Sequence, residues 1–359
     1  MDPSEQLIQL SITNLFECLD SEKREQFRED KPKEYPLVIK AMREESTVIA
    51  LRKFHNWVKL ILITEITGLA KTSKGFKNSK VSLMDIAVGR GGDISKWNKA
   101  GISNVFGFDK NMDSIKSKVL ENPGAEERLR SFVGNKVNIT FETGDITRQI
   151  DGFGIESKIT NYLRGNKING FDMVSCQFAL HYFFINEQSI RNVFQIVDLY
   201  LKPGGYFFGT TIDGKKLREY MSDSTDSTFQ RTLFRIESFF KKRLKSPWGN
   251  RYSFKIFDNK SSNNYFNSIP ESMEYLVDFE VLNKIAKEFS LEPVEYYLFE
   301  KYTTDTGKMN YSRNDNSIPG IIPFKNIYDR TYSKNGDTLS TEEKELSFLN
   351  SVFIFRKKF

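Results

Sequence analysis

The sequence predicts an α/β fold built on a mostly parallel sheet with helices on both faces. Between about residues 80 and 212, β-rich runs alternate with helical patterns, which is typical of parallel strands joined by helices. A glycine-rich stretch, DIAVGRGGD at 85–93, follows one β-rich run and precedes a helical pattern. Two later runs end in acidic residues, Asp109 and Asp145. Together these observations favour a domain that binds a nucleotide-like ligand.

Length and composition predict a soluble globular enzyme in a reducing compartment. The chain has 359 residues, 39% of them hydrophobic, which suits one large domain with insertions or two smaller ones. No stretch approaches the roughly 18 apolar residues of a membrane helix, and the start MDPSEQ has no secretory signal layout. Cys18 and Cys176 imply neither a disulfide framework nor a zinc site. The net charge of +6 permits an anionic partner without requiring one.

The first part of the chain divides into an extension and a long helix. Residues 1–45 are charged and weakly patterned, which favours an N-terminal extension or linker. From Val48, apolar residues recur at helical spacing, while Arg52, Asn56 and Lys59 fall on another face. This polar stripe is either a candidate binding edge or a plain solvated face.

The alternating segment comes next, and it breaks off at about residue 214. Strands are predicted over 80–88, 104–109, 137–145, 171–178 and 205–212, and helices over 93–101, 112–122 and 189–201.

The remainder of the chain is predicted to be an insertion followed by closing elements. Residues 215–270 are basic and polar, with KKRLK at 241–245, and are predicted to form an insertion or lid. A strand leading into a helix is predicted over 273–291, closing strands over 293–302 and 351–359, and a surface loop over 303–320.

The chemistry of the glycine-rich loop favours a sulfonium donor over a pyrophosphate. Asp109 lies 24 residues after Asp85, where a carboxylate can take both hydroxyls of a ribose, and Asp145 can accept from the amine of adenine. Acids at strand ends are also common as helix caps. Asp93 directly follows the last glycine, where a carboxylate suits an ammonium or sulfonium better than a phosphate. S-adenosylmethionine carries both cationic groups.

Longer motifs carry a family resemblance. A Q-F-x-x-H-Y run at 177–182 and an N-W-x-K helix at 56–59 accompany the glycine loop, WGNRYSF at 248–254 and MEYLVDF at 273–279. On these stretches, spread over roughly 48–356, the chain resembles the messenger RNA cap (guanine-N7) methyltransferases, and TTIDG at 210–214 resembles viral members most. The resemblance implies a Rossmann-like class I S-adenosylmethionine-dependent methyltransferase fold: a mostly parallel seven-stranded sheet within a domain over 46–359, with a lid at about 215–270.

The resemblance also assigns a donor site. It implies that S-adenosylmethionine contacts Lys59 through its methionine carboxylate, Asp93 through its methionine portion, Asp109 through its ribose and Asp145 through its adenine, with Gln177, Ala87 and Gly89 beside it. Ala87 replaces the family's usual glycine and adds a methyl group that we expect to be tolerated. No metal is implied.

The resemblance assigns a cap site next to the donor. Phe178, His181, Tyr182 and Glu274 would form the guanine pocket, Arg90 would face the triphosphate, and His55, Asn56 and Asn350 occupy further cap-contacting positions. The basic insertion, with Lys241, Lys242 and Arg243, either guides the RNA or is a solvated lid. Three residues depart from the family pattern, namely His55 for asparagine, Ile212 for proline and Asn350 for tyrosine, so guanine binding should depend more heavily on Glu274 and Tyr182.

The implied reaction is methyl transfer to N7 of the cap guanine without a general base. N7 loses no proton when methylated, so we expect catalysis by positioning and electrostatics, with Glu274, Tyr182, His181 and Phe178 as the positioning residues. On this view His181 is a hydrogen-bond partner of the guanine edge. Two alternatives stay open, a non-catalytic cap- or partner-binding subunit and a methyltransferase for another substrate.

Expected partners and compartment follow from the same resemblance. Capped RNA is the substrate, and the chain has no K-x-D-G nucleotidylation lysine, since the nearest match is Thr211-Ile212-Asp213-Gly214. Guanylyltransferase and triphosphatase activities are therefore expected in another protein or in another domain of a larger capping polypeptide, and the chain acts with or without a stimulatory subunit. A viral member would act in the host cytoplasm or virion, and a cellular member in the nucleus.

Overall fold

The computed structural model describes nine segments of the chain. They are residues 46–73, 80–119, 122–147, 154–222, 227–241, 243–257, 272–294, 318–335 and 338–359, with Lys23, Gln26 and Asp30 as isolated positions. Most of the predicted extension over 1–45, most of the predicted closing strand over 293–302 and nearly all of the predicted loop over 303–320 lie outside these segments. No helix in the described part combines the length and apolarity needed to cross a membrane.

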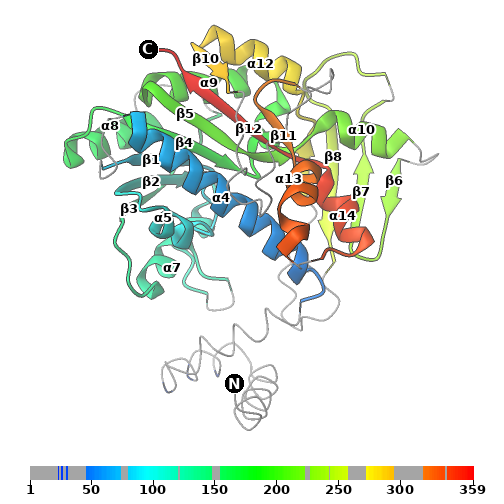
Figure 1. Ribbon diagram of the computed structural model, residues 1–359, viewed down its shortest axis with the longest axis horizontal. Coiled ribbons are helices and arrows are strands. Elements are labelled where there is room, and N and C mark those ends of the chain that lie inside the picture. Colours follow the sequence, from blue (N-terminus) through cyan, green and yellow to red (C-terminus); the bar gives the residue numbers. More distant parts are fainter. Residues whose placement is uncertain are drawn as a thin grey trace.

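The main sheet confirms the predicted Rossmann-like architecture (Figure 1). Its strand order is β10-β12-β5-β4-β1-β2-β3, and β11 also pairs with β12. Strands β1 to β5 are parallel, whereas β12 runs antiparallel to β5, β10 and β11. With β11 the sheet has eight strands, one more than the seven predicted. The strands are β1 Ser82–Ile86, β2 Asn104–Asp109, β3 Asn138–Thr143, β4 Phe171–Gln177, β5 Leu201–Ile212, β10 Leu291–Pro293, β11 Ile321–Pro323 and β12 Asn350–Lys357.

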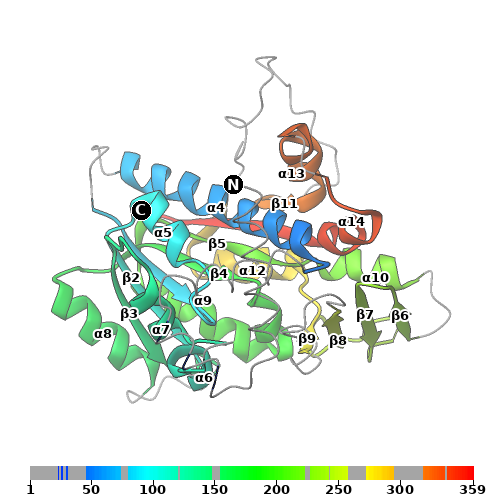
Figure 2. The ribbon, with the colours of Figure 1, turned by 90° about the horizontal axis from the view of Figure 1, so that it is seen from below.

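Helices cover both faces of this sheet (Figures 1 and 2). Alternate residues of β1 point to opposite sides, so Leu83 belongs to the apolar cluster that includes residues of α4, α5 and α13, while Met84 belongs to the cluster that includes residues of α8, α9 and α12. The helices are α4 Ile49–Ser73, α5 Ile94–Ala100, α8 Ile155–Asn166, α9 Glu187–Tyr200, α12 Phe279–Glu288 and α13 Phe324–Arg330. Both layers are apolar, which explains why the strand sequences read as nearly continuous hydrophobic runs.

The helices differ from the sequence-based expectation in several places. The predicted helix over 112–122 is α6, which spans only Met112–Lys116 because the backbone turns to an extended conformation at Ser117. Five α-helices of the described segments were not predicted: α7 Ala125–Ser131, α8, α10 Gly214–Ser222, α13 and α14 Thr341–Phe348. The last begins with a capping box between Ser340 and Glu343, a local signal that marks a helix start.

The segment predicted as a lid forms most of a second sheet (Figure 1). Four antiparallel strands follow helix α10 Gly214–Ser222, in the order β6 Thr228–Gln230, β7 Phe234–Ser238, β8 Arg251–Ile256 and β9 Ser272–Tyr275. Their inner face buries Phe234, Ile236 and Tyr252 against the start of α4, α10 and α14. This sheet therefore packs against the main domain through its own apolar core.

Candidate active site

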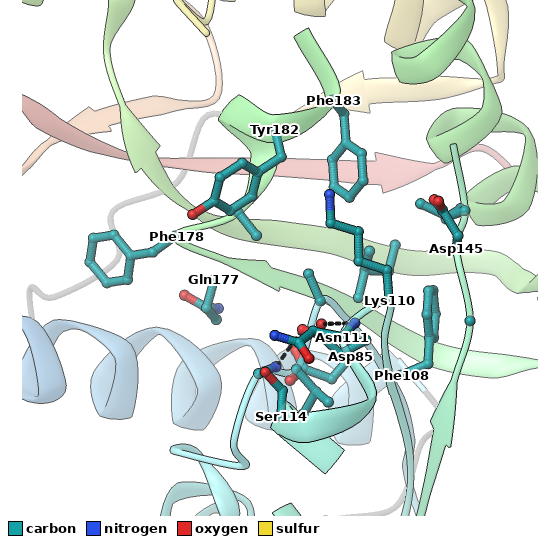
Figure 3. A pocket seen from close by; sticks show the side chains of 18 of the residues that line it. Asp85, Phe108, Lys110, Asn111, Ser114, Asp145, Gln177, Phe178, Tyr182 and Phe183 are labelled. Atoms are coloured by element: carbon teal, nitrogen blue, oxygen red, sulfur yellow. Dashed lines mark hydrogen bonds between the residues drawn. The ribbon is translucent and has the colours of Figure 1, made fainter. Parts of the chain in front are cut away.

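A cavity of about 550 Å³ lies at the carboxyl ends of β1, β2 and β4 (Figure 3). This edge is where an open α/β sheet binds ligands, because the connecting loops diverge there. All seven residues predicted to contact the donor line the cavity: Lys59, Ala87, Gly89, Asp93, Asp109, Asp145 and Gln177. Phe178 and Tyr182, predicted for the cap site, also line it. Figure 3 shows Gln177, Phe178 and Tyr182 on one side and Asp145 and Phe108 on the other.

The glycine-rich loop is held by the acid at the end of β2. The Asp109 carboxylate accepts hydrogen bonds from the backbone N–H of Gly89 at 2.9 Å and of Asn111 at 2.8 Å. The loop needs left-handed backbone at Ala87 (φ 57°) as well as at Gly89 (φ 54°) and Gly91 (φ 70°). Ala87 therefore carries backbone strain of about 1–2 kcal/mol, besides placing a methyl group in the cavity wall.

A buried ion triad forms the side of the cavity next to α4. Lys59 Nζ lies 2.7 Å from Asp93 Oδ1, and Lys96 Nζ lies 2.9 Å from the same oxygen. Burial alone would raise the pKa of Asp93, but attraction by the two ammonium groups outweighs it and lowers that pKa to about 2. The triad thus carries a net positive charge, which suits a carboxylate-bearing ligand.

Asp85 is a buried acid of the cavity that sequence reasoning did not assign to the site. Burial, followed by repulsion from Asp93, raises the pKa of Asp85 to about 8, although Ser175 donates a hydrogen bond to it. The carboxyl group is therefore largely protonated at neutral pH. The sequence does carry a signal for this residue, because Asp85 is a charged residue inside the apolar run SLMDIAV. The neighbouring Cys176 is a buried free thiol whose pKa is raised by burial, and Cys18 lies outside the described residues.

Asp145 and Gln177 lie on opposite walls of the cavity. Asp145 Oδ1 accepts from the backbone N–H of Thr147 at 2.9 Å and from its hydroxyl at 2.6 Å. Gln177 Oε1 accepts from the Thr210 hydroxyl at 3.0 Å, whereas its Nε2 is buried and has no hydrogen-bond partner within the described residues. A buried amide donor without a partner is costly unless a ligand accepts from it.

A second cluster of polar groups is centred on Glu274. Its Oε2 accepts from the hydroxyl of Tyr252 and its Oε1 from that of Ser272, each at 2.7 Å. His181 Nε2 lies 3.6 Å from Oε1 and has no hydrogen-bond partner in the described part of the chain. Burial lowers the pKa of His181, and Glu274 offsets this only in part, so the imidazole is neutral at pH 7. Tyr252 and Ser272 were not predicted as site residues.

The two clusters adjoin each other through η1, the 3₁₀ helix Leu180–Ile185. This helix carries both His181 and Tyr182, whose rings meet edge to face with centres 4.2 Å apart. Tyr182 lines the cavity, whereas His181 and Glu274, 3.6 Å apart, do not. One short element therefore joins the two parts of the site.

His55 and Phe178 form a stacked pair beside the cavity. Their ring centres are 5.1 Å apart and nearly parallel, and His55 Nε2 is hydrogen-bonded to the Ser347 hydroxyl at 2.7 Å. Burial, with a smaller effect of Lys59, lowers the pKa of His55 to about 3. Phe178 has left-handed backbone, with φ 52°. His55 thus contacts the cavity wall and does not itself line the cavity.

The three other predicted cap residues also lie outside the cavity lining. Asn56 is exposed, and its amide donates to the carbonyl of Arg52. The guanidinium of Arg90 donates to the carbonyl oxygens of Asp113 at 3.2 Å and Asn122 at 2.6 Å. Asn350 is buried, and its amide donates to the carbonyls of Leu346 and Ser347, where it caps the end of α14.

The cavity residues fit S-adenosylmethionine. The positive triad can attract a carboxylate, Asp109 and Asp145 offer carboxylates that can accept from hydroxyl and amine groups, and Gln177 Nε2 can donate to a ligand, which are the contacts that this donor needs. Within the described segments, no group of three or more histidine, cysteine, aspartate or glutamate side chains is arranged to hold a metal ion.

Sequence comparisons with known proteins agree on one family. A profile of the mRNA (guanine-N(7))-methyltransferase domain matches residues 21–358. The mRNA cap guanine-N(7) methyltransferase of Caenorhabditis elegans is 30% identical over 332 residues, which cover 88% of this chain and 82% of the nematode protein. The Saccharomyces cerevisiae protein of the same name is 29% identical over 328 residues, which cover 89% of this chain and 66% of the yeast protein. An S-adenosylmethionine-dependent methyltransferase structure from Clostridium acetobutylicum is 14% identical, with a TM-score of 0.46 over 82% of this chain and 91% of that one.

Proposed function

Because the chain belongs to the mRNA (guanine-N(7))-methyltransferase family, it transfers a methyl group from S-adenosylmethionine to N7 of the cap guanine of messenger RNA, and we propose which of its residues hold the two substrates. The observation that carries this proposal is the adjacency of two differently built sites. A cavity rich in carboxylates adjoins a buried cluster in which one carboxylate faces a neutral histidine. The two sites meet at Tyr182.

We assign the donor to the cavity. Lys59, in the positive triad, would attract the methionine carboxylate, and Asp93 the methionine amino group. Asp109 would accept from the ribose hydroxyls and Asp145 from the adenine amine, while both keep the backbone bonds that orient them. The free Gln177 amide would lie beside the reacting methyl group.

We assign the cap guanine to the pocket of Glu274, His181, Tyr182 and Phe178. A buried carboxylate accepts well from the N1–H and amino group of guanine, and aromatic rings stack on the base. The Tyr252 and Ser272 hydroxyls already donate to the Glu274 carboxylate, so its orientation is fixed before the guanine arrives. His181 Nε2 supplies a further polar contact.

The proposed mechanism needs no proton transfer. S-adenosylmethionine would supply an electrophilic methyl group on a sulfonium sulfur. N7 would take this methyl group with its own lone pair while the sulfur–methyl bond breaks and its electron pair stays on sulfur, leaving S-adenosylhomocysteine. Positive charge then develops on the purine, where the buried Glu274 carboxylate and the faces of Tyr182 and Phe178 stabilise it. Since neutral His181 neither gains nor loses a proton, its task is to hold the guanine edge. Catalysis consists of positioning two substrates in adjoining sites.

Replacing the central carboxylate tests the assignment. Glu274→Gln should lower kcat/KM for capped RNA about 100-fold or more while leaving the Kd of S-adenosylmethionine nearly unchanged, as measured by calorimetry. Glu345→Gln is the matched control, because Glu345 also accepts from a tyrosine hydroxyl at 2.7 Å, that of Tyr220. Equal loss of donor binding and activity in Glu274→Gln would refute the separate cap site.

Substrate choice gives a second test. With labelled S-adenosylmethionine, RNA carrying a guanosine cap should be methylated and uncapped guanosine-ended RNA should not. Calorimetry with the donor tests the alternative of a non-catalytic binding subunit. Such a subunit should show no affinity for S-adenosylmethionine, so measurable donor binding excludes it. Equal labelling of both RNAs would favour a methyltransferase of another substrate class.

We propose further that separate guanylyltransferase and triphosphatase domains supply the capped RNA, with or without a stimulatory subunit. The stretch from Thr211 to Gly214 supports this proposal, because Thr211 stands where a K-x-D-G nucleotidylation motif has its lysine. The compartment follows the source: the nucleus for a cellular member, and the host cytoplasm or virion for a viral one. The catalytic domain is proposed to span 46–359, with 1–45 as an extension.

A further inference from the structure

The second sheet has an outer face that differs from its inner face in chemistry. Along β9, Glu274 points inward to the guanine cluster, whereas its neighbour Met273 is 39% exposed. Along β8, Tyr252 is fully buried and its neighbour Arg251 is exposed. Just beyond the end of β7, Phe239 is 47% exposed and its backbone N–H donates to the carbonyl of Arg251. An aromatic ring and a guanidinium therefore lie together outside the sheet.

Exposed positive charges lie along the connection from β7 to β8. The guanidinium of Arg251 lies over the Phe239 ring, 4.7 Å from its centre. Lys241, Arg243 and Lys245 follow directly in the chain and are exposed. Residues 238–256 contain no aspartate or glutamate. We call Phe239, Lys241, Arg243, Lys245 and Arg251 the basic strip.

The basic strip is continuous with the element that forms the guanine pocket. After Lys245 the chain reaches Trp248, whose ring lies 5.3 Å from that of Phe184 in η1. Gly249 then donates from its backbone N–H to the Phe184 carbonyl at 3.0 Å. Since η1 also carries His181 and Tyr182, the connection that holds most of the strip is anchored on the element beside the pocket, and Arg251 and Phe239 lie together at its two ends.

We propose that the basic strip binds the first nucleotides of the RNA beyond the cap. The lysine and arginine side chains match consecutive phosphates, and the exposed face of Phe239 offers a stacking platform for a base. Such contacts read no sequence, which suits an enzyme that acts on transcripts of every sequence. The inference rests on the proposed position of the cap guanine, because that position sets where the RNA chain emerges.

Chain length of the substrate provides the test of the charges. Lys241→Glu/Arg243→Glu should raise the KM for a capped 10-nucleotide RNA about tenfold at low salt, and the KM for an unmethylated cap dinucleotide should stay the same. The slope of log KM against log salt should fall by about 1.4 for two lost phosphate contacts. Lys284→Glu/Lys287→Glu, at exposed positions on α12, makes the same change in net charge and should have no effect on either substrate.

The stacking platform has its own test. Phe239→Ala should raise the KM for the capped 10-mer about fivefold, Phe239→Trp should restore it, and neither should alter the cap dinucleotide. Unchanged KM values for the 10-mer in all strip variants would overturn the proposal. An equal rise in the KM for the cap dinucleotide would also overturn the proposal, because that result would place the strip in the cap pocket itself. Failure of the cap assignment gives a different result: Glu274→Gln would then methylate the cap dinucleotide with unchanged kcat/KM, whatever the strip variants do.

Discussion

The Tyr252 hydroxyl provides a sensitive probe of the proposed guanine pocket. Tyr252 is fully buried, and its hydroxyl donates to Glu274 Oε2 at 2.7 Å. Burial, together with the nearby Glu274, raises the pKa of Tyr252 well above its usual value, so the hydroxyl remains a donor at every pH of interest. Tyr252→Phe removes this hydroxyl and leaves the ring in place.

The expected magnitude follows from the bond that is lost. A hydrogen bond to a charged group contributes about 1.5–3 kcal/mol, and the Ser272 hydroxyl remains on the other oxygen of Glu274. If that orientation is used in the transition state, kcat/KM for the cap dinucleotide should fall about 10- to 100-fold. The Kd of S-adenosylmethionine should not change, since Tyr252 does not line the donor cavity.

A matched control separates catalysis from stability. Tyr220→Phe removes another hydroxyl that donates to a carboxylate at 2.7 Å, that of Glu345, and the ring packs against the same apolar core as Tyr252. Both variants should lose similar unfolding free energy in urea titrations. Undiminished methylation by Tyr252→Phe, or an equal loss in Tyr220→Phe, would refute the reasoning.

Three further predictions follow from strain and charge. Because burial lowers the pKa of His181, the methylation rate should stay nearly constant from pH 8 to pH 6.5, and a steep fall that vanishes in His181→Asn would contradict its proposed role. Burial lowers the pKa of His55 to about 3, so its stabilising contribution is full above about pH 6.5 and is lost as the pH falls; His55→Asn should flatten the decline of urea stability between pH 6.5 and pH 4, and an unchanged slope would tell against this. Ala87→Gly should raise the unfolding free energy by about 0.5–1 kcal/mol, measured by thermal denaturation, because glycine adopts the left-handed backbone without strain; a lowered melting temperature would show that Ala87 is not strained.

The donor side of the site was accessible from sequence because its residues are set by local order. Asp109 ends β2 and Asp93 follows the glycine loop, so strand and helix patterns alone bring them to one edge of the sheet. The structure departs from the sequence-based expectation mainly at Ala87. The added methyl group was expected, whereas the left-handed backbone of this residue was not. The pattern of hydrophobic residues along a sequence does not predict the backbone angle of a single residue.

The partners of the cap residues were not accessible, because they depend on pairing between distant segments. Tyr252 meets Glu274 only through the register of β8 with β9, and His55 meets Ser347 across 292 positions of the chain. Three of the missed helices are short, since α7 and α13 have seven residues each and α14 has eight. Helix α8 is longer, with 12 residues, and buries Ile155, Ile159 and Tyr162 at helical spacing, a signal that was present in the sequence.

The two parts of the proposed site draw on different sheets. The donor residues lie on α4 or follow strands of the main sheet, and Phe178, His181 and Tyr182 follow β4, whereas Glu274 and its partners Tyr252 and Ser272 belong to the second sheet, which has its own apolar core. Substitutions in the second sheet are therefore expected to change acceptor binding while donor binding is preserved. For an engineer, this division makes the four short strands a replaceable module, and acceptor libraries built there should retain donor affinity.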